Sequence, residues 1–217
     1  MRSTRSVVTK TSLLLLTAAT AMAWSAAARA DYIWMQRDGN GAHAYIGELE
    51  RPLTPAAGGL TTLRAYLADG MANGKDLPLA VQDRDYAITA PASGDIRVLA
   101  SRVSADGVLH YYQARYGRTE TKPVNDLELV PTTANGNTFK LIWKGNVVPA
   151  SQVNVVTSAG WRRTLKPTAD GAVTLATPFP GLYVLEITAR LNGSVTVDGK
   201  QYENVHHTAT LSFEVGS

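Results

Sequence analysis

Four histidines are the residues most able to carry out chemistry in the chain after residue 30: His43, His110, His206 and His207. Imidazole nitrogens bind divalent late transition metals well, and a site needs two or three such ligands, with carboxylates completing it. Cysteine is absent from the sequence, which excludes thiolate ligands and disulfides. The sequence therefore offers one candidate site, for Ni²⁺ or another divalent transition metal, with these ligands: His43, His110, His206 and Asp31. No cofactor is required otherwise.

The adjacent His206 and His207 cannot readily bind one ion, because successive side chains of a strand point to opposite faces. Within residues 205–215, His207 alternates with apolar residues and His206 with mostly polar ones. We therefore expect His207 to be a packing or hydrogen-bonded residue, and His206 to be the available ligand. The competing interpretation is that all four histidines are scattered structural or surface residues.

Two acidic patterns suggest cation sites without completing one. Asp83 and Asp85 would place two carboxylates on one face of a strand, and residues 38–41 partly match a calcium-binding loop. Ala42 and Leu49 stand where that loop needs further oxygen ligands. We expect solvated turn and strand charges at both places.

Trp161 is the aromatic residue that best fits a binding surface, since it follows the turn-forming residues 158–160 and precedes Arg162 and Arg163. An exposed ring beside two cations could serve a sugar or a protein partner. Cross-strand packing with an arginine stacked on the ring is the other interpretation. Trp143 alternates with core positions and is expected to be a packing residue.

Catalytic motifs are missing from the sequence. It contains no G-x-S-x-G, no H-E-x-x-H, no phosphate-binding loop and no cysteine nucleophile. We expect a protein that is not an enzyme.

Residues 1–30 are typical of a cleavable signal peptide. Arg2, Arg5 and Lys10 precede an apolar run over residues 12–24, and Ala28 and Ala30 supply the small residues of a cleavage site. A membrane anchor is the competing interpretation, but the run is shorter than the ~20 residues that cross a bilayer. We expect export through this segment, Asp31 as the mature N-terminus, and no membrane span after cleavage.

Removal of this segment changes the charge of the chain. The whole sequence has 21 basic and 18 acidic residues, and residues 1–30 hold four of the former and none of the latter. The chain after residue 30 is therefore almost neutral, which gives no support to a nucleic acid or an anionic membrane as partner.

Strand patterns dominate the rest of the chain. Short segments rich in Val, Ile, Thr, Tyr and Leu are separated by Gly, Asn, Asp and Pro. Residues 60–71 fit either a short helix or an irregular strand. Turn-forming residues 131–137 suggest a boundary. We expect an all-β protein with two β-sandwich-type domains in tandem, over residues 31–132 and 133–217. The predicted strands lie within residues 32–36, 43–49, 86–89, 96–103, 109–116, 127–130, 139–143, 153–157, 161–165, 173–175, 182–189 and 205–215.

Several motifs carry a family resemblance. GNVVPA at 145–150, TADG at 168–171 and PGLY at 180–183 resemble the transthyretin-like or carboxypeptidase-regulatory type of immunoglobulin-like sandwich. Preceded by WMQRDG at 34–39, AYIGE at 44–48, ARYGR at 114–118 and LELVP at 127–131, they make the chain similar to a bacterial periplasmic family of unknown function, often labelled nickel-uptake associated.

The resemblance implies an N-terminal β-domain followed by an immunoglobulin-like or transthyretin-like sandwich. Family members commonly place a histidine near the mature N-terminus, where it and the free amine can chelate Ni²⁺, Co²⁺ or Cu²⁺. Asp31 stands at that position here.

Two functional hypotheses arise from these observations. The first is a periplasmic, non-catalytic binding or accessory protein for nickel or cobalt uptake, with a transport component as its partner. The alternative is a structural or interaction module of the cell envelope that binds a protein or glycan partner through loops and the Trp161 hairpin.

Overall fold

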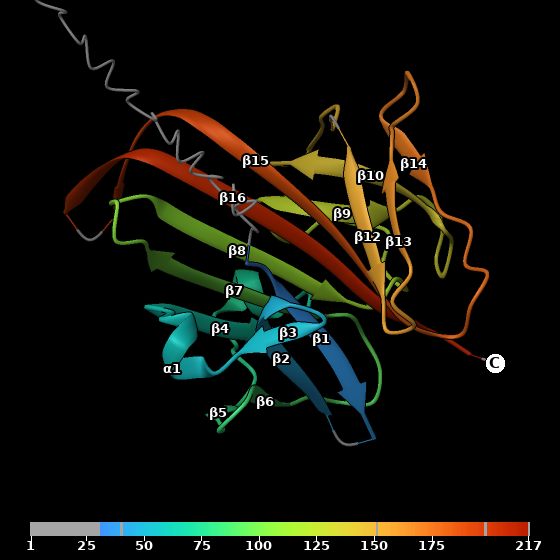
Figure 1. Ribbon diagram of the computed structural model, residues 1–217, viewed down its shortest axis with the longest axis horizontal. Coiled ribbons are helices and arrows are strands. Elements are labelled where there is room, and N and C mark those ends of the chain that lie inside the picture. Colours follow the sequence, from blue (N-terminus) through green and yellow to red (C-terminus); the bar gives the residue numbers. More distant parts are fainter. Residues whose placement is uncertain (1–30, 40, 151, 198, 217) are drawn as a thin grey trace, which may run out of the picture.

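A computed structural model of the chain describes residues 31–39, 41–150, 152–197 and 199–216. The signal peptide predicted over residues 1–30 lies outside the described residues. Most regular structure in the described part is β, which confirms the all-β prediction (Figure 1). Within those ranges, no helix has the length and apolar character needed to cross a membrane.

The N-terminal part forms a small antiparallel sheet in the order β1-β2-β6-β5, with β3 also paired to β2. The predicted turn at residues 38–41 joins β1 to β2, with Asp38 opposite Gly41. Glycine is needed there, because a Cβ at Gly41 would lie 2.2 Å from the carbonyl oxygen of Ile88. The strands are β1 (Ile33–Asp38), β2 (Gly41–Glu48), β3 (Arg51–Leu53), β5 (Leu79–Val81) and β6 (Tyr86–Thr89).

A seven-stranded sheet forms the centre of the molecule, in the order β13-β12-β15-β16-β8-β7-β4. Only β16 and β8 pair in parallel, and the other neighbours are antiparallel. The strands are β4 (Thr62–Tyr66), β7 (Ile96–Val103), β8 (Leu109–Tyr116), β12 (Val153–Thr157), β13 (Arg162–Leu165), β15 (Gly181–Val197) and β16 (Lys200–Val215).

This sheet combines strands from both predicted domains. β8 belongs to residues 31–132 and β16 to residues 133–217, yet they are hydrogen-bonded neighbours over eight residue pairs, from Val205 opposite Leu109 to Ser212 opposite Tyr116. An arrangement of two separate sandwiches in tandem is therefore not confirmed.

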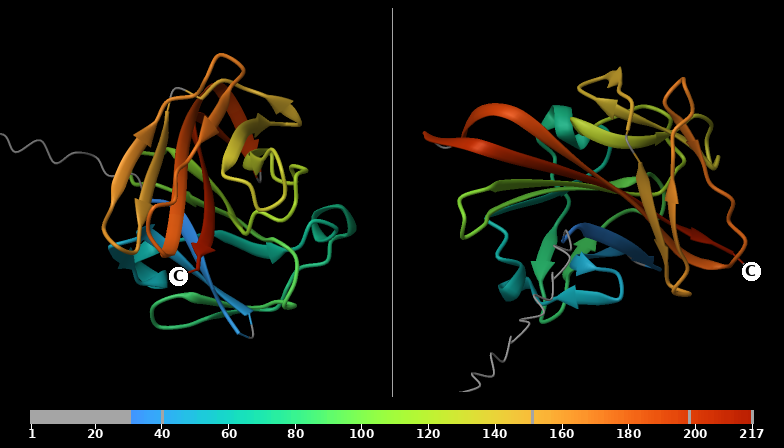
Figure 2. Two further views of the ribbon diagram at one scale, coloured as in Figure 1. Left: turned by 90° about the vertical axis from the view of Figure 1, so that its right-hand side faces the viewer. Right: turned by 45° about the horizontal axis from the view of Figure 1, so that its top comes forward.

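A four-stranded sheet lies on one face of the seven-stranded sheet and the small sheet lies on the other (Figures 1 and 2). In the four-stranded sheet, β10 pairs with β9, β11 and β14. Its strands are β9 (Leu127–Pro131), β10 (Thr138–Trp143), β11 (Asn146–Val147) and β14 (Ala172–Thr174). Two short helices, α1 (Pro55–Gly58) and α2 (Gly70–Asn73), complete the described elements.

Each face of the central sheet has its own apolar core. Leu141 of β10 and Leu211 of β16 belong to the core beneath the four-stranded sheet. Met35 of β1 and Val98 of β7 belong to the core beneath the small sheet. The two cores separate because side chains alternate between the faces of a strand.

The C-terminal half of β16 is buried on both faces. Leu211 and Phe213 lie in the core beneath the four-stranded sheet, as the alternation predicts. On the other face, the Thr210 hydroxyl donates to the carbonyl of Ile33, and the Met35 amide donates to Ser212 Oγ at 3.1 Å. Hydroxyl-bearing residues therefore tie β16 to β1, since buried polar groups need hydrogen-bond partners.

Residues 60–71 form a strand followed by the start of a one-turn helix. β4 pairs with β7, with Ala65 opposite Val98, and α2 begins at Gly70. Strand pairing explains why the helical spacing of Leu60, Leu63 and Leu67 does not produce a longer helix, because tertiary contacts override a weak local preference.

A buried ion cluster occupies the face of β7 and β8 that points away from the small sheet. Arg115 lies 2.5 Å from Asp95 and 2.8 Å from Glu128. Arg97 lies 3.1 Å from Glu128 and 2.7 Å from Glu120. Four of the five side chains are at most 1% exposed, and Glu120 is partly exposed. Every charge has a partner of opposite sign, which a buried charge requires.

The same cluster fixes the loop between β8 and β9. Glu128 accepts hydrogen bonds from the amides of Val124 and Asn125 at 2.7 and 2.8 Å. Asp95 accepts from the Thr119 hydroxyl at 2.7 Å. Burial alone would raise the pKa of Asp95, but the hydrogen bond from Thr119 and the charge of Arg115 outweigh it and lower the pKa.

Arg115→Met should destabilise the protein by about 3 to 5 kcal/mol, because it leaves Asp95 and Glu128 buried with fewer positive partners. The free energy of unfolding in urea measures this change. Arg64→Met is the matched control, since Arg64 and Asp76 form an exposed ion pair at 2.8 Å whose loss should cost less than about 1 kcal/mol. Equal losses for the two variants would contradict a structural role for the cluster.

Candidate functional site

Three of the four proposed metal ligands lie at one end of the central sheet. Arg102 on β7 pairs with His110 on β8, and His110 pairs with His206 on β16. Residues opposite each other on neighbouring strands point to the same face, so the side chains of Arg102, His110 and His206 form a row across the sheet. Asp31, just before β1, reaches this row through Arg102.

The two imidazole rings contact each other. The ring centroids of His110 and His206 lie 5.2 Å apart, with the planes at 86°. Two imidazoles that bind one ion, each through a nitrogen about 2 Å from it, have centroids roughly 4.5 to 5.3 Å apart. The spacing of these rings is therefore compatible with a shared ion.

The environment of His110 favours its neutral form. Burial, and then the nearby positive charge of Arg102, lower the pKa of His110 below its ordinary value. Because only a neutral imidazole has a lone pair available for a metal, a lowered pKa reduces the competition from protons.

Asp31 is close to the pair but already has a partner. Its carboxylate accepts a hydrogen bond from Arg102 at 2.7 Å, and its charge acts on His110. In residues 31–216, outside the few undescribed positions, no three His, Cys, Asp or Glu side chains are grouped so that they could hold a metal. The described residues therefore bring together two imidazole rings and one nearby carboxylate that is paired with Arg102.

His43 lies away from this row, in the β1–β2 hairpin. Its Nε2 is 2.9 Å from Asp38 and its Nδ1 is 3.2 Å from Asp85. The hydrogen bond with Asp85, followed by that with Asp38, outweighs burial and raises the pKa of His43. With both ring nitrogens engaged, His43 has no lone pair directed at a third group.

His207 is an interior residue, which matches its expected packing role. His207 is 8% exposed. The centroid of its ring lies 5.1 Å from that of the Tyr111 ring and 4.9 Å from that of the Trp143 ring. The side chain of Gln113 accepts from the Leu127 amide at 2.8 Å, so its amide group donates to His207 Nδ1 at 3.1 Å. Burial lowers the pKa of His207 to about 4.

Trp161 packs rather than projecting into solvent. Its ring lies 6.1 Å from Phe179 and contacts the core beneath the four-stranded sheet. Thr157 Oγ1 accepts a hydrogen bond from the backbone amide of Trp161 at 3.1 Å. Of these two aromatic residues, only Phe179 ranks among the exposed large hydrophobic residues of the described chain, at 40%. The structure therefore agrees with the interpretation of Trp161 as a packing residue.

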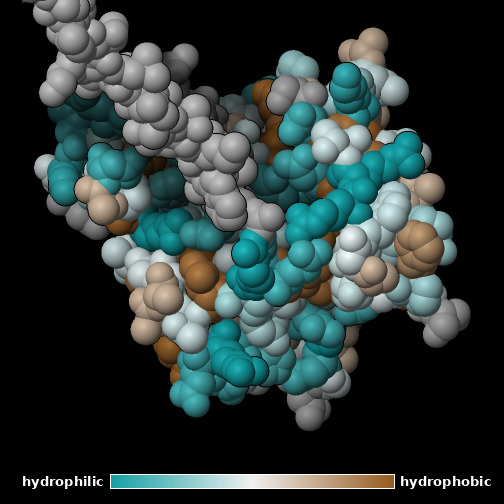
Figure 3. Space-filling view, in the orientation of Figure 1, coloured by the Kyte–Doolittle hydropathy of each residue, from teal (hydrophilic) through white to brown (hydrophobic). Residues whose placement is uncertain are grey.

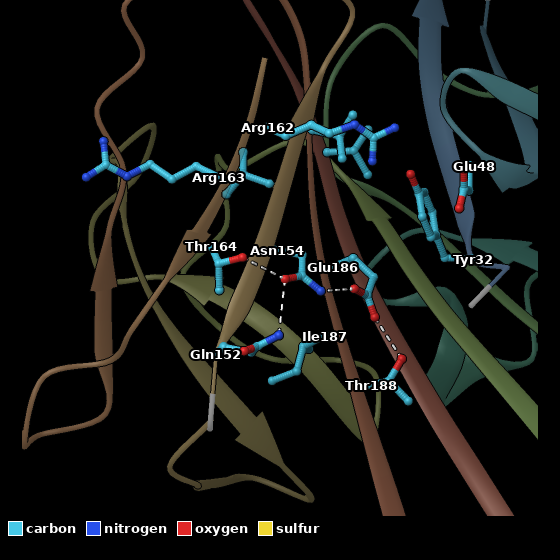
Figure 4. A pocket seen from close by; sticks show the side chains of 13 residues that line it. Tyr32, Glu48, Gln152, Asn154, Arg162, Arg163, Thr164, Glu186, Ile187 and Thr188 are labelled. Carbon is cyan, nitrogen blue, oxygen red and sulfur yellow. Dashed lines mark hydrogen bonds between the residues drawn. The ribbon is translucent and has the colours of Figure 1, made fainter. Parts of the chain in front are cut away.

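A polar groove of about 790 Å³ lies over β13, β12 and β15, on the face of these strands that points away from the core beneath the four-stranded sheet (Figure 4). Glu48 of the small sheet and Tyr32, just before β1, form part of its wall. Hydrophilic residues also gather in the middle of the molecular face in Figure 3. No local sequence pattern indicates this groove, because its residues come from segments whose pairing is not evident from the chain.

A chain of side-chain hydrogen bonds crosses the groove. Thr164 and Gln152 donate to Asn154 Oδ1 at 3.2 and 3.3 Å. Asn154 Nδ2 donates to Glu186 at 2.8 Å, and Thr188 donates to the other Glu186 oxygen at 2.7 Å. Strand register produces this line, since Asn154 lies opposite Thr164 on one side and Glu186 on the other.

The pKa values of His43 and His207 should be shifted in opposite directions. The pKa of His43 should lie above 6.5, so its ion pairs stabilise the fold below the unfolded pKa and lose this contribution as pH rises through the folded pKa. The pKa of His207 should be about 4, so its contribution is present above about 6.5 and is lost as pH falls toward 4.

An NMR titration of the histidine ring protons measures both values. Asp85→Asn should lower the pKa of His43, because it removes the largest cause of the shift, and should leave His207 unchanged. Titration of both rings near the ordinary histidine value would contradict the described environments.

Comparison with known proteins adds no assignment to these sites. No protein-family model matches the chain. No curated protein is similar enough to match it. The resemblance to the nickel-uptake associated family therefore stays a prediction, and any function must be inferred from the geometry and chemistry of the described residues.

Proposed function

We propose that this protein is a periplasmic, non-catalytic binding protein that carries a divalent late transition metal, such as Ni²⁺ or Co²⁺, and passes it to a transport component. The contact between the His110 and His206 rings carries the proposal. These residues are distant in sequence, and the parallel pairing of β8 and β16 brings them together.

The character of the site supports reversible binding. His110 and His206 are both partly buried, so an ion there would remain accessible to water and to a partner. Two imidazoles leave coordination positions for water or for a ligand from the partner. Asp31 could complete the set only by exchanging its bond with Arg102 for one with the metal. Such a site suits a carried ion better than a permanently held one.

Calorimetric titration of the protein with Ni²⁺, Co²⁺, Cu²⁺ and Zn²⁺ tests the proposal. His110→Ala and His206→Ala should each weaken binding by at least about tenfold, because even changes outside the ligand shell cost that much. His43→Ala is the matched control, since this histidine is engaged by two aspartates elsewhere, and it should bind like the unaltered protein. Absence of binding, or equal weakening by all three variants, would refute the proposal.

A second variant tests the electrostatics of the site. Arg102→Gln removes a positive charge that acts on His110 and releases Asp31, so metal binding should become tighter. Binding by the unaltered protein should weaken as pH falls, because protons compete with the metal for imidazole. Weaker binding by Arg102→Gln, with unchanged thermal stability, would contradict a role for Asp31 beside the pair.

A further inference from the structure

The polar groove presents an ordered array of hydrogen-bonding groups. Asn154 uses its oxygen for two donors and its nitrogen for Glu186, so its orientation is fixed by its neighbours. Glu186 is held in the same way by Asn154 and Thr188. Donors held in place by neighbouring groups lose less conformational freedom when a ligand binds.

Capacity for further hydrogen bonds remains in this array. The amide of Gln152 has a second N–H and an oxygen, and the hydroxyls of Thr164 and Thr188 can accept as well as donate. All three side chains are accessible at the groove. A ligand lying across the strands would therefore meet both hydrogen-bond donors and acceptors.

The charge of the groove does not favour a polyanion as its ligand. Glu48, Glu186 and Arg162 line it, whereas Arg163, opposite the core residue Val155, points to the other face of the sheet (Figure 4). Arg162 is paired with Glu50 at 2.7 Å. Binding of nucleic acid relies on a concentration of positive charge, which is not what these residues provide.

The apolar content of the groove does not suit a protein partner. Protein interfaces depend on aromatic or aliphatic anchors that become fully buried. Among the described residues that line the groove, Tyr32 is the single aromatic one. It is 7% exposed, and its hydroxyl accepts a hydrogen bond from the Leu49 amide at 3.1 Å. The adjacent edge strand β13 carries Arg162 and Arg163, and charged side chains on an edge oppose strand addition.

We propose that the groove binds a neutral, hydroxyl-rich carbohydrate chain. Neighbouring sugar hydroxyls both donate and accept, which complements the carboxylate of Glu186 and the amides of Asn154 and Gln152. Val156, which also lines the groove and is partly exposed, offers surface for the C–H faces of sugar rings. This binding involves residues distinct from His110 and His206 and does not depend on the metal proposal.

Binding of neutral hexasaccharides to the full protein tests the proposal. Maltohexaose, cellohexaose and N-acetylchitohexaose are compared with an extended peptide rich in serine and asparagine, by calorimetry and by NMR shifts of the groove amides. At least one hexasaccharide should bind. Asn154→Ala and Gln152→Ala should each weaken it about tenfold, as expected for the loss of one or two hydrogen bonds.

Asn146→Ala is the matched control, because Asn146 is exposed on β11, outside the groove, and bonds the Lys144 carbonyl. It should bind the hexasaccharide unchanged. Gln152 is exposed, so its variant should keep the thermal stability of the unaltered protein and separates lost binding from lost folding. Failure of all three hexasaccharides to bind, equal binding by the Gln152 variant and the unaltered protein, or groove-dependent binding of the peptide alone would overturn the proposal.

Discussion

The parallel pairing of β16 with β8 is the constraint on which the rest of the structure depends. It places β16 in the middle of the seven-stranded sheet, between β15 and β8, and joins the two halves of the chain in one sheet. Parallel neighbours need a long connection, and the segment between β8 and β16 contains the whole four-stranded sheet. That sheet then covers one face, and the small sheet covers the other.

This central position explains why polar groups are buried in the interior. Thr210 and Ser212 point at the small sheet and bond the backbone of β1, so the second face of β16 needs hydroxyls as well as apolar groups. On β7 and β8, the face opposite the small sheet holds Arg97 and Arg115. Their acidic partners are Asp95, just before β7, and Glu120 and Glu128, in the loop before β9 and at its start. Polar networks in which every group has a partner fix one arrangement of neighbouring segments, because another arrangement would leave a buried charge without a partner.

The two proposed binding places result from different parts of the same sheet. His110 and His206 meet where β8 and β16 run side by side. The polar groove forms where β13, β12 and β15 meet the small sheet at Tyr32 and Glu48. A metal site and a groove for a neutral ligand can therefore occupy one molecule without sharing residues.

The sequence by itself determined the all-β class, the positions of most strands, the β1–β2 turn and the interior place of His207, because alternation and turn chemistry are local properties. It also supplied the candidate ligands. Only the tertiary structure decided that His110 meets His206 while His43 pairs with Asp38 and Asp85. The tertiary structure likewise decided the chain of side-chain hydrogen bonds through Asn154 and the pairing of β8 with β16. Register between distant strands depends on which segments become neighbours, and no local pattern of residues encodes that choice.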